Sequence, residues 1–187
     1  YRVLKNKGNY NNHIGVPLTA FQVGPEHEVV IFEMGMSGFH EIENLCRIVK
    51  PRIGVITNIG TSHIEKLGSR ENIFKAKMEI TKHFDQREYI LIANGDDEFL
   101  GRLKNQNTPY QKYFVGFHED CHFQAISINE IGEKGVRFKA SVQGQDYDFA
   151  LQVPGKHNVY NALCAIAIGY VLGVEPDRIS EGLQAFQ

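Results

Sequence analysis

The 187-residue sequence has few cysteines, almost no net charge and no long apolar run. Its three cysteines are widely spaced and odd in number, so neither a disulfide framework nor a zinc site follows, and a reducing cytoplasm fits best. The formal net charge of -2 gives no electrostatic basis for binding nucleic acid or an anionic membrane surface. The most apolar stretch, residues 162–172, is shorter than the roughly 18 residues that a membrane span needs. It predicts a buried helix.

The sequence also lacks the G-x-x-x-x-G-K-[ST] loop that holds phosphates in many nucleotide-binding proteins. It begins at Tyr1 without a charged and then apolar leader, so we expect no signal peptide. Because it starts close to an apparent strand and ends within a helical pattern, we expect it to be a piece of a longer protein.

Three continuous apolar runs predict strands that are buried on both faces of a parallel sheet. They lie at residues 28–33, 52–58 and 89–93, and a shorter strand is predicted at residues 1–5. Helical patterns separate the runs, one at residues 41–49 and one after Ser69, a predicted N-cap. This alternation predicts an α/β fold with a mostly parallel sheet flanked by helices.

Residues 111–153 differ in character and predict a small antiparallel sheet appended to the main one. Its strands are expected at residues 113–117, 123–129, 136–142 and 147–153, with hairpin turns at residues 133–135 and 143–145. Two helices follow, one at residues 157–172, whose small residues are expected to allow close packing, and one at residues 175–186. We expect a single domain over residues 1–187 that contains this sub-sheet.

Lys77 is the most informative single residue. Ile73, Ile80 and Phe84 recur at helical spacing and form one apolar stripe, and Lys77 falls on that stripe. A cation there must extend to solvent, pair with an anion or be chemically changed. The simplest interpretation is that the side chain reaches solvent.

Two further groups are predicted at the carboxyl ends of the strands, where open parallel sheets bind ligands. Glu33 closes one buried run, and His63 lies in the loop after the next. A carboxylate and a neutral imidazole suit a divalent cation. The alternatives are that Glu33 caps a strand or helix and that His63 is structural.

Asparagines form two further candidate groups. Asn158 and Asn161 share a face at the start of the alanine-rich helix, beside His157. Asn158 is an N-cap by default, but a pair of amides can also read the edge of adenine. The loop at residues 8–17 is dense in asparagine and glycine, which suits turns first and ligand contacts second.

These motifs together resemble the central domain of the Mur ligases, the ATP-dependent enzymes that build the peptide of bacterial cell-wall precursors. The matching segments are GNYNNHIGVPLT (8–19), VVIFEMGMSG (29–38), ITNIGTSHIEKLGS (56–69), ENIFKAKMEI (71–80) and GKHNVYNALCAIA (155–167). The first two look most like the family member that adds D-Ala-D-Ala to UDP-MurNAc-tripeptide.

The resemblance implies a role for each candidate residue. The lysine matching Lys77 is carbamylated by CO₂ in the family and helps to bind Mg²⁺, and Glu33 and His63 match the other metal ligands. The asparagines matching Asn158 and Asn161, with His157 beside them, lie at the adenine of ATP. The loop from Asn9 to Gly15, including Asn11 and Asn12, matches a segment close to the nucleotide-sugar substrate.

The resemblance implies a reaction that forms an amide through an acyl phosphate. It also implies a cytoplasmic, monomeric enzyme that acts in peptidoglycan synthesis and thereby contributes to cell shape and cell division. The resemblance places the phosphate-binding loop upstream of Tyr1. It also places an N-terminal UDP-sugar domain and a C-terminal domain outside the chain, so we expect these 187 residues alone to be inactive. The alternatives are another Mur ligase, a folylpolyglutamate synthetase-like ligase, or a non-catalytic nucleotide-binding module.

Overall fold

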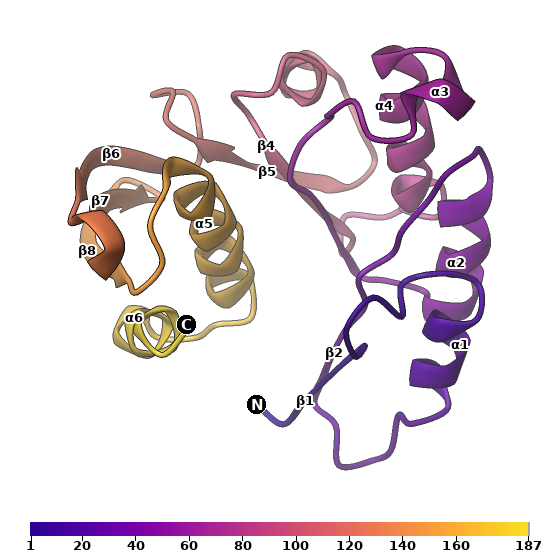
Figure 1. Ribbon diagram of the computed structural model, residues 1–187, viewed down its shortest axis with the longest axis horizontal. Coiled ribbons are helices and arrows are strands. Elements are labelled where there is room, and N and C mark those ends of the chain that lie inside the picture. Colours follow the sequence, from indigo (N-terminus) through magenta and orange to yellow (C-terminus); the bar gives the residue numbers. More distant parts are fainter. Residues whose placement is uncertain (187) are drawn as a thin grey trace. The chain divides into compact units, whose positions relative to one another are not determined.

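The computed structural model describes residues 1–186, in which strands alternate with helices in the first half of the chain and a run of strands is followed by two helices in the second half (Figure 1). The strands are β1 (Val3–Lys5), β2 (Val29–Ile31), β3 (Ile53–Ile56), β4 (Ile90–Asn94), β5 (Gln111–Gly116), β6 (Phe123–Glu130), β7 (Val136–Val142) and β8 (Gln145–Leu151). The α-helices are α1 (Gly15–Ala20), α2 (Glu41–Val49), α3 (Ile64–Leu67), α4 (Arg70–Met78), α5 (Lys156–Val171) and α6 (Pro176–Gln184). The 3₁₀ helices are η1 (Glu79–Thr81), η2 (Leu100–Asn105) and η3 (Gly132–Lys134).

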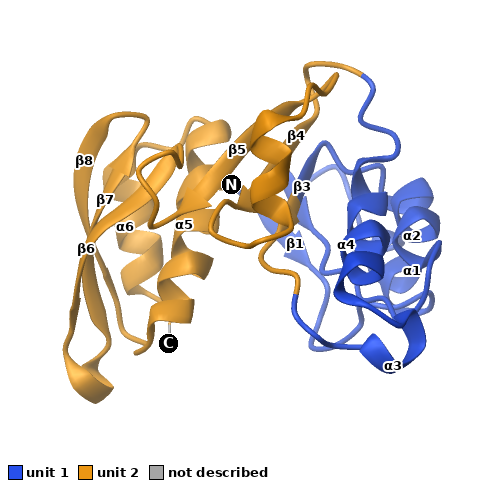
Figure 2. Cartoon of the chain, turned by 90° about the horizontal axis from the view of Figure 1, so that it is seen from above, with its two compact units in different colours: residues 1–54, 60–85 blue, residues 55–59, 86–187 orange. Residues whose placement is uncertain are grey.

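The chain divides into two compact units (Figure 2). The first unit contains residues 1–54 and 60–85, and the second contains residues 55–59 and the chain from residue 86 onward. The first unit carries β1, β2 and helices α1 to α4. The second carries most of the β-sheet together with α5 and α6.

In the first unit, β1 and β2 form a two-stranded parallel sheet with Val3 opposite Val29. The sequence predicts residues 28–33 as a strand that is buried on both faces of a parallel sheet, and the predicted burial is wrong. The strand is present, but β2 pairs with β1 alone in its sheet, and Ile31 is 50% exposed. Periodicity identifies a strand, whereas its partner is chosen by long-range contacts.

The larger sheet has the order β3-β4-β5-β6-β7-β8, and apart from Ile53 and Gly54 of β3 it belongs to the second unit. The pairs β4–β5 and β5–β6 are parallel, and the pairs β6–β7 and β7–β8 are antiparallel. The mixed α/β class is therefore as predicted. The antiparallel strands continue the same sheet, and the strand expected at residues 113–117, which is β5, is a parallel member of it.

The hairpin between β7 and β8 follows the predicted turn. Its two connecting residues, Gln143 and Gly144, have φ angles of 51° and 87°. Two consecutive positive φ angles match the right-handed twist of the flanking strands, and glycine adopts such an angle without strain. This tight turn fixes Val142 opposite Gln145.

Helix α5 supplies much of the core of the second unit and contacts β4, β5, β6 and β7. Its small residues permit this close packing, as the sequence predicts. Gly169 is the clearest case, because a Cβ there would lie 2.7 Å from Ile179 Cδ1 of α6. Cys164 is buried in the same helix, and all three cysteines are free.

Helix α4 carries Lys77 and begins as predicted, because Ser69 Oγ accepts a hydrogen bond of 3.2 Å from the backbone N–H of Asn72. The α-helix ends at Met78, and the chain tightens into η1. Of the predicted stripe, Ile73 and Phe84 are buried and Ile80 is partly exposed. The change of helix type shifts the phase of the stripe after Lys77, which is itself partly exposed.

Across residues 1–186, no helix combines the length and the apolar character that crossing a bilayer requires.

Candidate functional site

The loop at residues 8–19 is held directly against the segment that carries Glu33. Asn11 Nδ2 donates a hydrogen bond of 2.7 Å to Glu33 Oε1, and the backbone N–H of Gly35 donates one of 2.7 Å to the Asn11 carbonyl. Asn6 adds a second connection, since its amide donates to the Glu33 carbonyl at 3.0 Å and accepts from the Glu33 N–H at 2.8 Å. These bonds fix both the backbone and the carboxylate of Glu33.

The loop itself is ordered by its own asparagines. Asn12 Oδ1 accepts hydrogen bonds of 3.0 Å from the N–H groups of Ile14 and Gly15, at the start of α1. A Cβ on Gly15 would lie 2.5 Å from the Tyr10 backbone, so only glycine fits there. Of the three predicted substrate-side asparagines, Asn12 is committed to loop structure, Asn11 contacts Glu33, and Asn9 is exposed.

His63 lies at the N-cap of the short helix α3 with a left-handed φ of 64°. Such an angle is uncommon for a residue with a side chain and marks a backbone fixed by its surroundings. The imidazole is exposed, and within the described residues no hydrogen bond or ion pair engages its ring. It is therefore free to bind a ligand.

Glu33, His63 and Lys77 all belong to the first compact unit. In the described part of the chain, no group of three or more His, Cys, Asp and Glu side chains could hold a metal ion. A metal site formed by Glu33, His63 and Lys77 therefore stays a prediction.

A buried carboxylate that sequence reasoning missed lies two residues after Lys77. Glu79 is 5% exposed, and it accepts hydrogen bonds from the backbone N–H groups of His40 at 2.7 Å and Glu43 at 3.3 Å. These are unpaired amides at the start of α2, where a negative charge is stabilised. Glu79 therefore fixes the end of α4 to the start of α2, the helix that follows the Glu33 segment.

The predicted adenine-side residues lie at the start of α5, in the second unit. The N-cap is Gly155, not Asn158. Asn158 Nδ2 donates a hydrogen bond of 2.8 Å to the Pro154 carbonyl, which leaves its amide oxygen to accept from a ligand. His157 and Asn161 are exposed.

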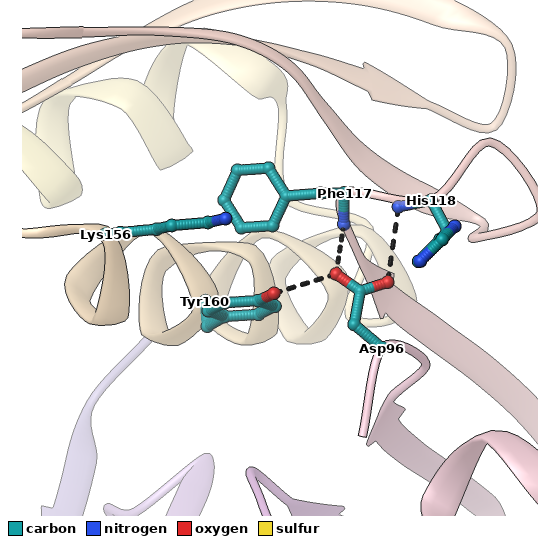
Figure 3. A pocket seen from close by; sticks show the side chains of 5 residues that line it. All are labelled: Asp96, Phe117, His118, Lys156 and Tyr160. Carbon is teal, nitrogen blue, oxygen red and sulfur yellow. Dashed lines mark hydrogen bonds between the residues drawn. The ribbon is translucent and has the colours of Figure 1, made fainter. Parts of the chain in front are cut away.

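Beside this helix start lies a pocket of about 230 Å³ that sequence reasoning also missed (Figure 3). Its lining residues are Asp96, Phe117, His118, Lys156 and Tyr160. The available signal was the pair of consecutive acids, Asp96 and Asp97, that follows the buried strand β4.

Asp96 is the centre of that pocket. Its Oδ2 accepts hydrogen bonds from the Phe117 N–H at 2.6 Å and the Tyr160 hydroxyl at 2.8 Å, and its Oδ1 accepts one from the His118 N–H at 3.2 Å. Burial, followed by the hydrogen bond to Asp96, raises the pKa of Tyr160, so its hydroxyl stays a donor.

A family model described as the Mur ligase middle domain matches residues 1–169 of the chain, a range that contains every candidate site residue. The chain belongs to the Mur ligase family. The resemblance drawn from the motifs is confirmed.

Curated relatives indicate which member of the Mur ligase family the chain is most similar to. The protein of Bacillus subtilis (strain 168) named UDP-N-acetylmuramoyl-tripeptide–D-alanyl-D-alanine ligase is 40% identical over 187 residues, which cover 100% of this chain and 39% of that protein. The Escherichia coli (strain K12) protein of the same name is 28% identical over 180 residues, which cover 96% and 40% of the two chains. The chain thus spans about two fifths of the length of these relatives.

Two solved structures that resemble the chain belong to the same member of the family. MurF from Acinetobacter baumannii has a TM-score of 0.91 at 30% identity and is matched over 100% of this chain and 40% of that one. MurF from Thermotoga maritima, solved in complex with ADP, has a TM-score of 0.84 at 25% identity, with 100% and 42% covered. The Mur ligase fold is therefore present throughout the chain, while the metal and nucleotide roles of individual residues stay predictions.

Proposed function

We propose that this chain is the ATP-using central part of a Mur ligase that joins D-Ala-D-Ala to UDP-MurNAc-tripeptide in peptidoglycan precursor synthesis. The observation that carries the proposal is the 40% identity, over all 187 residues, to a relative named for that reaction. The arrangement around Glu33 supports it, because the two segments that most resemble this member of the family are bonded to each other through Asn11.

The proposed reaction has two steps. The terminal phosphoryl group of ATP passes to a carboxylate oxygen of the UDP-MurNAc-tripeptide, and ADP leaves. The amino nitrogen of D-Ala-D-Ala then attacks the acyl carbon, the bond from that carbon to the phosphate oxygen breaks, and phosphate and a proton are released. Such a reaction depends on positioning and on neutralising the negative charge of the phosphates.

The residues of the first unit fit an oxygen-preferring cation when Lys77 is carbamylated. Glu33 Oε1 is oriented by Asn11 and its Oε2 remains for a cation, His63 has an unoccupied ring, and a carbamate would convert Lys77 from a cation into an oxygen donor. Bound Mg²⁺ would supply charge neutralisation for the transferred phosphoryl group. The chain's own task is to hold these donors in fixed positions.

The start of α5 is proposed to take the adenine of ATP. The Asn158 amide is fixed through Pro154, so its oxygen has a defined direction, and the exposed amide of Asn161 lies on the same helix face. Two amides offer both donors and acceptors to a base edge, with His157 beside them.

The remaining proposals concern the setting of the intact protein. We place it in the cytoplasm as a monomer, where its substrates are a soluble nucleotide-linked peptide and a dipeptide. Neither nucleic acid nor a membrane is needed as a partner. The net charge of -2 agrees with small-molecule substrates.

The decisive experiment is a ligation assay on the intact parent protein with ATP, Mg²⁺ and UDP-MurNAc-tripeptide. D-Ala-D-Ala is compared with L-Ala, D-Glu and L-Lys as amino donors. We expect phosphate release and a pentapeptide product with D-Ala-D-Ala alone. Faster use of another donor would assign the protein to a different Mur ligase or to a folylpolyglutamate synthetase-like enzyme.

A second experiment addresses the non-catalytic alternative. The roughly 40 codons before Tyr1 are read for a G-x-x-G-K-[ST] sequence, whose backbone amides and lysine hold phosphates. Its presence supports the enzyme, and its absence together with no ATP-dependent product supports a binding module. The 187-residue chain by itself is expected to give no product, and detectable ligation by it would contradict this expectation.

A further inference from the structure

Asp96 joins three segments that are distant in sequence, all of them in the second unit (Figure 3). It follows the end of β4, and its carboxylate binds the first two backbone N–H groups beyond β5, those of Phe117 and His118. The same carboxylate accepts the hydroxyl of Tyr160 from α5. One side chain therefore sets the spacing between two strand ends and the start of a helix.

The approach of Asp96 to β5 is close enough to restrict the residue opposite. A Cβ on Gly116 would lie 2.5 Å from Asp96 Oδ1, a distance that only glycine avoids. The carboxylate is thus seated against the backbone of β5, and its hydrogen bonds of 2.6 to 3.2 Å are in the normal range.

The rings around Asp96 add a second constraint on α5. Phe117 and Tyr160 meet edge to face with their centroids 4.8 Å apart, and Lys156 Nζ lies 4.3 Å from the centroid of the Phe117 ring. Both Lys156 and Tyr160 belong to the first turns of α5 and lie on the same face of that helix. Asp96 and Phe117 therefore contact the start of α5 on one face.

The residues proposed to read adenine occupy the same turns. Asn158 lies two residues before Tyr160, and Asn161 directly follows it. In a helix, a rotation or shift of Tyr160 carries both asparagines with it, because the backbone between them is rigid. The position of Tyr160 therefore affects where the backbone places both asparagines.

We propose that the Asp96–Tyr160 hydrogen bond is a positioning element for nucleotide recognition, which fixes the first turns of α5 so that Asn158 and Asn161 face the adenine. This rests on the proposed function for the ligand, while the geometry of the cluster stands without it. Asp96 and Tyr160 act through the asparagines and do not touch the nucleotide.

The test is Tyr160→Phe in the intact parent protein, with ADP, ATP and GTP as probes. The substitution removes only the hydroxyl and keeps the ring contact with Phe117. We expect ATP and ADP to bind about fivefold more weakly, the loss that corresponds to one hydrogen bond. The preference for ATP over GTP should fall in parallel, whereas the KM for D-Ala-D-Ala should stay unchanged.

A matched control is Tyr147→Phe. Tyr147 also donates its hydroxyl to a side chain, Gln145 Oε1 at 2.7 Å, but it lies in β8, in the antiparallel part of the sheet. We expect this variant to keep nucleotide affinity and the ATP preference. A purely structural role of Tyr160 would lower the melting temperature in both variants without changing the ratio of ATP to GTP affinity.

Two outcomes would overturn the proposal. The first is an unchanged ATP-to-GTP ratio in Tyr160→Phe. The second is unchanged nucleotide binding in Tyr160→Phe but weakened binding in Lys156→Ala, which would mean that the pocket itself contacts the nucleotide. A wrong proposed function would give a different result. The unmodified parent protein would then form no ligation product, whatever its affinity for nucleotides.

Discussion

Asn11 and Glu33 are joined side chain to side chain, with Asn11 Nδ2 2.7 Å from Glu33 Oε1. The asparagine donates to one carboxylate oxygen, and its own backbone carbonyl is held by Gly35. A neutral donor of this kind fixes the direction of a carboxylate without cancelling its charge. Carboxylates that bind metal ions are commonly oriented by hydrogen bonds in this way.

Asn11→Ala tests the importance of that orientation. In the intact parent protein we expect kcat/KM for ligation to fall about tenfold, because a hydrogen bond to a charged group is lost. The concentration of Mg²⁺ that gives half-maximal activity should rise. Asn44→Ala, at an exposed position in α2, is the control and should change neither quantity. Normal Mg²⁺ dependence in Asn11→Ala would mean that the Asn11 hydrogen bond does not orient a metal ligand.

Lys77→Ala tests the carbamate. We expect ligation to be abolished or greatly reduced in the intact parent, and added bicarbonate should not restore it, because alanine has no amine to modify. Lys75→Ala, an exposed lysine of the same helix, should keep its activity. If Lys77→Ala stays folded and near normal in turnover, the side chain merely reaches solvent, as the simplest interpretation of the sequence holds.

Glu79→Ala tests the connection between α4 and α2. Two backbone amides at the start of α2 lose their buried acceptor, and we expect the free energy of unfolding to fall by about 2 kcal/mol. Urea unfolding of the intact parent measures the change. Glu65→Ala removes an exposed glutamate of α3 and serves as the control. Equal stability of the two variants would show that Glu79 contributes nothing to this connection.

Glu43 supplies a prediction about acid stability. Hydrogen bonds from Lys82 and then His40 lower the pKa of its carboxyl from 4.5 to about 2, and Arg47 adds a further contact at 2.9 Å. Because the folded pKa lies below the unfolded one, the stabilisation is complete above pH 4.5 and is lost as the pH falls toward about 2.

The measurement is the urea midpoint of the parent protein and of Glu43→Gln across that range. The difference between the two should be largest near neutral pH and should shrink toward zero at the acid end. Charge pairs near a surface are also screened, so 1 M salt should reduce the difference. If the difference in urea midpoint did not change with pH, the stabilisation would not come from the ionised Glu43 carboxylate.

Much of the fold follows from local patterns. Ser69 caps α4, the alanine-rich run forms α5, and the turn at Gln143 and Gly144 closes the last hairpin, all as predicted. These features depend on residues within a few positions of one another. The family motifs extended this reach to the class of fold and the family, which composition alone does not give.

The sequence could not show which strands pair or which acids bind the backbone. Nothing near Val29 indicates that its partner is β1, so the two-stranded sheet was missed. Asp96 and Glu79 bind amides that are 21 and 39 residues away. A lone acid whose partners are backbone N–H groups has no spacing signature, because every residue type except proline supplies the same donor.

The chain separation between Asp96 and Tyr160, 64 residues, has a consequence for the order of folding. Closing so long a loop is entropically costly, so this bond forms only after the strands between its ends have assembled. A refolding protein would pair β4 with β5 and seat the carboxylate first, and would orient its asparagines only when α5 docks. Recovery of nucleotide binding should then lag behind recovery of the sheet, which makes nucleotide affinity a late reporter of the completed native state.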